Sequence, residues 1–156
     1  MSRADILLQY SSGPKTGVFT DGSCEGNPGP GGWGAVWVEE DRIIEELGGS
    51  DPDTTNNRME LAAMIAGLRM LPPDSRATLY SDSNICVQTV NQWAAGWERR
   101  GWRRKSGPIA NLELVKELWA IAQQRSGVTV QWIKAHDGSR WNEYADAIAT
   151  EQTANN

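Results

Sequence analysis

Apolar and polar positions follow two different periods along the chain, and each period predicts one kind of secondary structure. Short apolar runs bounded by turn residues predict strands, whereas apolar residues three or four positions apart predict amphipathic helices. Predicted strands cover residues 18–20, 33–38, 42–47, 77–80 and 128–133. Predicted helices cover residues 56–71, 84–93, 112–124 and 141–151, with Pro72 ending the first of them.

The order of these elements predicts an α/β fold. Three consecutive strands form a meander, and the two later strands alternate with helices. This order predicts a five-stranded mixed sheet, antiparallel in its first three strands and then parallel, flanked by helices. One domain is predicted over residues 17–152, with residues 51–55 as a loop and the Trp- and Arg-rich segment interrupting the second helix. Residues 1–16 are predicted to be a weakly structured, flexible leader.

Composition supports a single globular domain. The chain has 156 residues, of which 39% are hydrophobic and 22% charged. No apolar run approaches the roughly 18 residues that a membrane span needs, and none resembles a secretory signal. We therefore expect a cytoplasmic protein without membrane association. Cys24 and Cys86 lack metal-type spacing and are predicted to be free thiols.

The net charge of −5 argues against a polyanionic partner, but the charge is unevenly distributed. Five of the fifteen basic residues, Arg99, Arg100, Arg103, Arg104 and Lys105, fall in one short segment interleaved with Trp93, Trp97 and Trp102. Tryptophans packed in the core beside solvated arginines would explain this pattern without a ligand. A protrusion at about residues 93–108 that contacts nucleic-acid phosphates explains it better.

A glycine- and proline-rich stretch follows the first predicted strand. Asp21 ends the apolar run 18–20, and five glycines and two prolines lie within residues 22–32. Glycines allow a ligand to approach the backbone closely, and prolines stiffen the turn. Asp21 alone would be interpreted as an ordinary turn aspartate. Together with acids further along the chain, it indicates a site for a metal or phosphate.

Four acids are predicted to converge. Asp21 and Asp82 each follow a strand, and parallel neighbouring strands would bring both to the same end of the sheet. Glu60 begins the first helix, and Asp146 lies among alanines in the last helix, where small residues permit close approach. Each acid has a simpler explanation. Asn57-x-x-Glu60 matches a capping box, Asp82 or Ser83 would cap the next helix, and Asp146 would be a solvated charge.

Clustered carboxylates favour a bound cation, because like charges at close range raise one another's pKa. Oxygen-only ligands favour Mg²⁺ or Mn²⁺ over zinc. Two ions about 4 Å apart would support phosphodiester cleavage. His136, the only histidine, lies in a loop ten positions before Asp146 and suits proton exchange or product departure. Without Asp146 nearby it would be interpreted as a surface residue.

Several motifs resemble those of type 1 ribonuclease H, the prokaryotic ribonuclease HI family. They occur in the family's order over about residues 17–150. The motifs are Phe19-Thr20-Asp21-Gly22-Ser23-Cys24 with Gly26-Asn27-Pro28-Gly29-Pro30-Gly31-Gly32, Thr54-Thr55-Asn56-Asn57-Arg58-Met59-Glu60-Leu61, Ser81-Asp82-Ser83, Gln92-Trp93 through Arg99-Arg100-Gly101-Trp102, Trp132-Ile133-Lys134-Ala135-His136, and Asn142-Glu143 with Asp146.

The resemblance implies a ribonuclease H-like fold and a monomer that hydrolyses the RNA strand of RNA–DNA hybrids, leaving 5′-phosphate and 3′-hydroxyl ends. It implies that Asp21, Glu60, Asp82 and Asp146 bind two Mg²⁺ or Mn²⁺ ions and that His136 assists catalysis. The substrate-binding residues that it implies are Cys24, Asn27, Asn56, Asn57, Asn84, Trp93, Trp97, Arg99, Arg100, Trp102, Arg103 and Arg104.

The chain departs from the family pattern at four positions. Ala135 precedes His136 where glycine is common, and Asn84 replaces a common glutamine. Asp53 and Glu98 stand where cations are frequent. Two rival functions fit the same fold, a catalytically silent hybrid-binding module and a metal-dependent nuclease or strand transferase acting on DNA. Retention of all four acids argues against the first, and the paired Asn56-Asn57 motif argues against the second.

Overall fold

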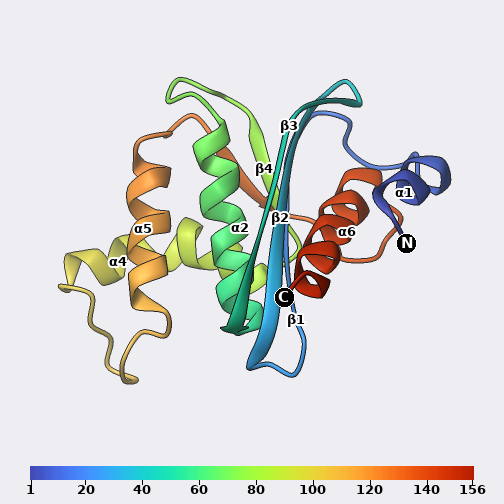
Figure 1. Cartoon of the computed structure of the whole chain (residues 1–156). Helices are drawn as coiled ribbons and strands as arrows, with labels where there is room; N and C mark the ends of the chain where they lie inside the picture. Colours follow the sequence, from blue (N-terminus) through green and yellow to red (C-terminus); the bar gives the residue numbers. More distant parts are fainter.

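A five-stranded sheet forms the centre of the computed structural model, which describes residues 1–156 (Figure 1). The strands are β1 (Gly17–Cys24), β2 (Gly29–Glu39), β3 (Arg42–Thr54), β4 (Thr78–Ser81) and β5 (Thr129–Trp132). They lie in the order β3-β2-β1-β4-β5. The first three strands pair antiparallel, and β4 pairs parallel with both β1 and β5. The predicted α/β class and mixed sheet are confirmed.

Helices cover both faces of this sheet (Figure 1). One face carries a set of helices led by α2 and α5, and the other carries α6 with α1 against it. The first set is α2 (Asn56–Met70), α3 (Asn84–Gln88), the π-helical turn η1 (Thr89–Trp93), α4 (Ala94–Arg99) and α5 (Leu112–Gln123). The second is α1 (Arg3–Gln9) and α6 (Arg140–Ala154). None of the helices combines the length and apolar character needed to cross a bilayer.

Each face of the sheet has its own hydrophobic cluster. Consecutive side chains of a strand point to opposite faces, so Val18 and Phe19 of β1 belong to different clusters, both fully buried. The first cluster joins Val18 to apolar residues of α2 and α5, among them Leu61 and Leu118. The second joins Phe19 to α6 and also includes residues of α1 and β2. Burial on both faces explains why β1 is the central strand.

Two predicted boundaries are wrong because the sheet's hydrogen bonding overrides local propensity. The strand predicted at 18–20 runs on to Cys24 and pairs with β2 as far as Gly31, so the turn is confined to residues 25–28. The loop predicted at 51–55 is largely strand, since β3 pairs with β2 through Thr54. Pro52 is tolerated there because β3 is an edge strand with one unpaired side.

The second helical region is also longer than predicted. The helix continues from α3 through η1 into α4, so the Trp- and Arg-rich segment begins within the helix rather than interrupting it. Val90 belongs to the first cluster and Ala94 is also buried, so this stretch is held against the domain. Packing therefore extends the helix to Arg99 before the chain enters an exposed loop.

The prediction of a weakly structured leader is wrong for residues 3–9. They form α1, which begins with a capping box in which Ser2 and Asp5 exchange hydrogen bonds at 3.0 and 3.1 Å. Ile6 is only 3% exposed and packs in the second cluster. Ile6, Leu7 and Leu8 are consecutive and therefore give no helical periodicity, which is why the pattern did not indicate an ordered helix.

Candidate active site

Two neighbouring parallel strands bring Asp21 and Asp82 together. β1 and β4 pair in parallel, with Thr20 opposite Ser81. Asp21 directly follows Thr20, and Asp82 directly follows Ser81. The Thr20 hydroxyl donates to the Tyr80 carbonyl at 3.1 Å and fastens the two strands just before the acids. The expected convergence at one sheet end is therefore confirmed for this pair.

Glu60 reaches the same place from the first turns of α2. It is 4% exposed, and its Oε1 accepts a 2.8 Å hydrogen bond from the Gly22 backbone N–H. Only glycine fits at position 22, because a Cβ there would lie 2.4 Å from the Glu60 nitrogen and 2.5 Å from the Met59 carbonyl carbon. The glycine lets α2 lie directly on β1.

Asp146 approaches from the opposite face on α6. This helix packs closely on β2, where a Cβ on Gly34 would lie 2.8 Å from the Ala145 carbonyl oxygen. Ala145 and Ala149 are completely buried at this contact. The predicted role of small residues beside Asp146 is confirmed. Asp146 itself is half-buried and close enough to Asp21 and Asp82 to raise the pKa of both carboxyls.

The carboxylates form two adjoining triads. Potential ligand atoms of Asp21, Glu60 and Asp82 lie within 4.8 Å of one another. Those of Asp146, Glu143 and His136 do so as well. The structure thus brings together all four predicted acids and the predicted histidine, and it adds Glu143.

Burial and mutual repulsion raise the pKa of the first triad. Burial is the main reason that the pKa of Asp21 lies well above its usual value, and Glu60 and Asp82 raise it further. Burial raises the pKa of Glu60 to about 7 although hydrogen bonds from Asp21 and Gly22 oppose the shift. The pKa of Asp82 is raised by burial too. A cluster of carboxyl groups with raised pKa values binds either protons or a cation.

The donor set fits a hard divalent cation. It consists of carboxylate oxygens, and Glu60 Oε2 is buried without a hydrogen-bond partner. No lysine or arginine forms an ion pair with any of the four predicted acids. Because a buried charge needs a partner, these oxygens suit a metal ion better than a structural role.

The simpler explanations hold only in part, because the cap of α3 is Ser83 rather than Asp82 and the cap of α2 does not involve Glu60. Thr55, not Asn57 with Glu60, caps α2, accepting from the Arg58 N–H at 3.2 Å. Ser83 caps α3, accepting from the Cys86 N–H at 3.3 Å, which leaves the Asp82 carboxylate free for the site. Asp146 is half-buried rather than fully solvated.

Glu143 belongs to one of the motifs shared with the family but was not among the predicted site residues. Its Oε1 lies 3.6 Å from His136 Nδ1, and burial raises the pKa of its carboxyl while the histidine lowers it. It lies three residues before Asp146, so one helix face carries both acids. The i, i+3 spacing was the available signal, but acids at that spacing are common on exposed helices.

Polar residues predicted to bind substrate surround the acids. Asn27, Asn56 and Asn84 are exposed, whereas Asn57 and Cys24 are half-buried. Asn27 Oδ1 accepts from the Asn56 N–H at 2.8 Å and ties the turn after β1 to the start of α2. The Cys24 thiol lies 3.4 Å from the Thr54 carbonyl oxygen. These five residues are together called the polar rim below.

Cys86 supports this rim from below. Its thiol donates to Asn57 Oδ1 at 3.2 Å, and burial raises its pKa to about 11, so it stays protonated and able to donate. A cavity of about 360 Å³ lies beneath, between Cys86 and Trp93. Sequence reasoning missed this contact because a lone buried cysteine carries no pattern.

The predicted protrusion divides into packed and exposed residues. Trp97 and Trp102 pack against the first hydrophobic cluster, and Lys116 Nζ lies 5.7 Å from the centre of the Trp102 ring. Trp93 remains 38% exposed. The interpretation of the tryptophans as core residues is therefore correct for two of the three. The protrusion owes its position to these two rings.

The cations of the protrusion are exposed. Arg99, Arg100 and Arg103 face solvent without carboxylate partners. Arg104 is exposed but donates to the carbonyls of Gly107 and Pro108 at 3.2 and 3.0 Å, which shapes its own loop. Three free guanidinium groups beside a half-exposed indole form a surface suited to nucleic-acid phosphates.

Comparison with known proteins agrees with this geometry. The sequence model of the RNase H family matches residues 14–154. The chain is 46% identical to the ribonuclease H of Alcanivorax borkumensis over 133 residues, covering 85% of this chain and 87% of that protein. It is 45% identical to the ribonuclease HI of Caulobacter vibrioides over 139 residues, covering 88% and 92%.

Among solved structures, the crystal structure of LC9-RNase H1, a type 1 RNase H, is similar with 33% identity and a TM-score of 0.72. The match covers 93% of this chain and 75% of that one. The similarity includes the strand that carries Asp21 and the helix that carries Asp146, since both lie within the residues matched by the family. The chain therefore belongs to the RNase H family.

Proposed function

We propose that this protein is a metal-dependent endonuclease that hydrolyses the RNA strand of RNA–DNA hybrids, leaving 5′-phosphate and 3′-hydroxyl ends. The single observation that carries the proposal is the triad of buried Asp21, buried Glu60 and half-buried Asp82, with ligand atoms within 4.8 Å, in a chain of the RNase H family. Curated relatives at 45–46% identity are named ribonuclease H or HI.

Asp21, Glu60, Asp82 and Asp146 would hold two divalent cations, Mg²⁺ or Mn²⁺. When bound, such ions supply a polarised water nucleophile and charge stabilisation for the leaving oxygen in phosphodiester hydrolysis. Gly22 orients Glu60 through its N–H, leaving Glu60 Oε2 unpartnered for a ligand. His136 is exposed and next to Glu143, a place from which it exchanges protons with solvent and assists product departure.

The polar rim and the protrusion would hold the substrate. Cys24, Asn27, Asn56, Asn57 and Asn84 border the acids and offer amide and thiol groups to the minor groove, where 2′-hydroxyls distinguish RNA from DNA. Trp93, Arg99, Arg100 and Arg103 offer an aromatic face and cations to the DNA strand. Trp97, Trp102 and Arg104 would act by holding the protrusion in place.

A cleavage assay with three substrates tests the proposal. Labelled RNA–DNA hybrid, double-stranded RNA and single-stranded RNA are incubated with Mg²⁺, Mn²⁺ or a chelator. We expect cleavage of the hybrid alone, with either metal, and none with chelator. Cleavage of hybrid at full rate in chelator would refute metal dependence, and equal cleavage of double-stranded RNA would refute hybrid specificity.

Two variants separate catalysis from binding. Asp21→Asn should abolish cleavage while hybrid binding stays within a few-fold, because it removes a predicted metal ligand and little contact surface. Asp74→Asn makes the same chemical change at an exposed turn and should cleave normally. Full activity of Asp21→Asn would contradict the metal-site assignment.

We further propose that the protein acts as a cytoplasmic monomer. Its two cysteines are free, as expected in a reducing compartment. Size-exclusion chromatography with light scattering is expected to give the mass of one 17.2 kDa chain. A stable dimer would contradict this assignment without affecting the catalytic one.

A further inference from the structure

Residues 2–13, here called the N-terminal strap, lie outside the 14–154 range matched by the RNase H family. They are nevertheless folded and docked. α1 lies against α6, far from the α2 face of the sheet (Figure 1). Buried Ile6 inserts between the two helices and the sheet, while Leu8, two positions away, is 88% exposed. The strap therefore contacts the domain through buried Ile6 and partly buried Tyr10 and leaves Leu8 in solvent.

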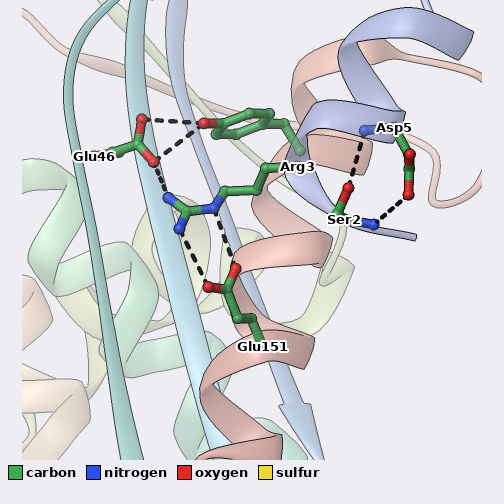
Figure 2. A network of polar contacts seen from close by, with 6 residues as sticks. Ser2, Arg3, Asp5, Glu46 and Glu151 are labelled. Atoms are coloured by element: carbon green, nitrogen blue, oxygen red, sulfur yellow. Dashed lines mark hydrogen bonds and ion pairs between the residues drawn. The ribbon is translucent and has the colours of Figure 1, made fainter.

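Arg3 ties the start of the strap to two elements at once (Figure 2). Its guanidinium forms ion pairs with Glu46 of β3 and with Glu151 of α6, the second at 3.1 Å. The Tyr144 hydroxyl of α6 donates to the same Glu46 carboxylate at 3.0 Å. Because these side chains are partly exposed, the network adds orientation more than stability.

The other end of the strap replaces a missing helix cap. Ser139 occupies the N-cap position of α6 but makes no capping hydrogen bond, and its buried Oγ has no partner. The N–H of Arg140, one of the unsatisfied donors of the first turn, instead donates to the Ser12 carbonyl at 2.9 Å. Gly13 permits this approach, since a Cβ there would lie 2.5 Å from Ser139 Oγ.

The Arg140 side chain completes the attachment. Its Nε donates to the Tyr10 carbonyl at 2.5 Å and its Nη2 to the Leu7 carbonyl at 3.5 Å, both at the C-terminal end of α1. A cation is favoured there because unpaired carbonyls collect at a helix C-terminus. Arg140 thus connects the end of α1 to the beginning of α6 through its side chain and its backbone.

The first turn of α6 carries part of the second triad. Glu143 lies in that turn, and its N–H donates to the Ser139 carbonyl at 3.0 Å. His136 lies three residues before Ser139, with a left-handed backbone φ of 53°. Any displacement of the first turn therefore moves Glu143, His136 and, one turn later, Asp146.

We propose that the N-terminal strap holds the first turn of α6 in the position at which His136, Glu143 and Asp146 act, with Arg140 as the positioning residue. The inference rests on the proposed function for its kinetic consequence. The structural part of the proposal is that docking of the strap orders the first turn of α6. This part does not depend on any activity.

Paired variants test the proposal. Ile6→Asp undocks the strap, and Leu8→Asp makes the same change on its exposed side. Arg140→Met removes the two side-chain bonds to α1 together with a 3.8 Å ion pair to Asp41, and Arg69→Met removes an exposed ion pair with Glu117 elsewhere. Hydrogen exchange of the amides of residues 140–143, measured without metal, reports the first turn. Steady-state cleavage of a hybrid with Mg²⁺ reports kcat and KM.

We expect Ile6→Asp and Arg140→Met to speed exchange at residues 140–143 at least tenfold. We expect kcat to fall about tenfold with KM within twofold, because small displacements of positioned groups cost large factors in rate. Leu8→Asp and Arg69→Met should match the parent in both measurements. Arg140→Lys, which keeps one charged donor, should recover part of the lost kcat.

Faster exchange in residues 2–13 with parental kcat and unchanged exchange at 140–143 would overturn the proposal. If Ile6→Asp does not fold, Ile6→Ala against Leu8→Ala makes the same comparison with a smaller change. A parent protein that cleaves no hybrid would refute the proposed function, whereas the exchange measurement would still decide whether the strap orders α6.

Discussion

The backbone N–H of Gly22 donates a 2.8 Å hydrogen bond to Glu60 Oε1, while Glu60 Oε2 is buried without a partner. One oxygen is therefore fixed by the protein and the other is left for a ligand. The contact joins β1 to α2 at the site and depends on the absence of a side chain at position 22. The backbone geometry at Gly22 therefore determines how Glu60 is oriented in the proposed metal site.

Gly22→Ala is expected to damage both folding and catalysis. The added Cβ would lie 2.4 Å from the Glu60 nitrogen, so α2 must move away from β1. Overpacking of this kind costs roughly 1–3 kcal/mol of unfolding free energy. The displacement of Glu60 should lower kcat/KM about 100-fold. Urea denaturation and hybrid cleavage measure the two effects.

Gly96→Ala is the control for this substitution. Gly96 lies in α4, and a Cβ there would meet only the mobile end of the Arg100 side chain at 3.3 Å. Alanine favours helix over glycine by about 1 kcal/mol, so stability should hold or rise. Parental activity in Gly22→Ala would show that the close approach of α2 is not needed.

The metal-free protein should lose stability as pH rises from 4.5 to 8. Burial raises the pKa of Glu60 to about 7 from the ordinary value of 4.5, so the folded state binds more protons than the unfolded state in this interval. Unfolding free energy therefore falls with rising pH through the folded pKa, by roughly 3 kcal/mol for this group. Urea denaturation in chelator at several pH values measures the fall.

Glu60→Gln should remove much of that pH dependence. The amide has the same shape but no charge, so it relieves repulsion with Asp21 and Asp82 above pH 7 and makes the metal-free protein more stable there. Cleavage should nevertheless be lost, because a predicted metal ligand is gone. A pH profile identical to the parent's would mean that Glu60 does not carry the shift.

Neutralising Arg99, Arg100 and Arg103 to Gln should raise KM and flatten its salt dependence. Each phosphate contact contributes roughly 0.7–0.9 to the slope of log affinity against log salt. All three guanidinium groups are exposed and lack carboxylate partners, so they are available to phosphates. Hybrid binding at several salt concentrations measures the slope.

A triple Gln variant at Arg42, Arg69 and Arg76 matches the net charge change with exposed arginines from other surfaces. It should lower affinity slightly and leave the slope nearly unchanged. An equal loss of slope in both triple variants would indicate a general charge effect, and the protrusion would then have no specific role in binding.

Alanine substitution should mainly lower stability at Trp102 and mainly weaken hybrid binding at Trp93. Trp102 packs on the first hydrophobic cluster, so Trp102→Ala should cost about 2–4 kcal/mol of unfolding free energy. Trp93 is 38% exposed, and Trp93→Ala should cost far less while raising KM for the hybrid. Denaturation and kinetics of the two variants form a matched pair. A larger stability loss at Trp93 would reverse the assigned roles.

The sequence carried enough information to predict the sheet and the four acids. Alternating and helical periods located every strand and the helices α2, α3, α5 and α6, whereas α4 was expected to be an interruption; of the acids, Asp21 and Asp82 followed predicted strands, Glu60 lay near a helix start and Asp146 lay within the last helix. Asp21 and Asp82 were predictable because the parallel pairing of β1 with β4 ends at Thr20 and Ser81, one residue before each acid. These features depend on local chain geometry, which neighbouring residues largely determine.

Long-range contacts decided what the pattern did not show. α1 is ordered because Ile6 enters a cluster formed by residues more than ten positions away, and β3 extends through Thr54 because β2 supplies partners. Glu143 joins the site only because α6 lies where Ser12 and Gly34 allow it. The sequence by itself was enough to name the four acids and the histidine that we propose carry the chemistry. The tertiary structure alone decided which oxygens are buried and unpartnered, because burial depends on packing between distant segments.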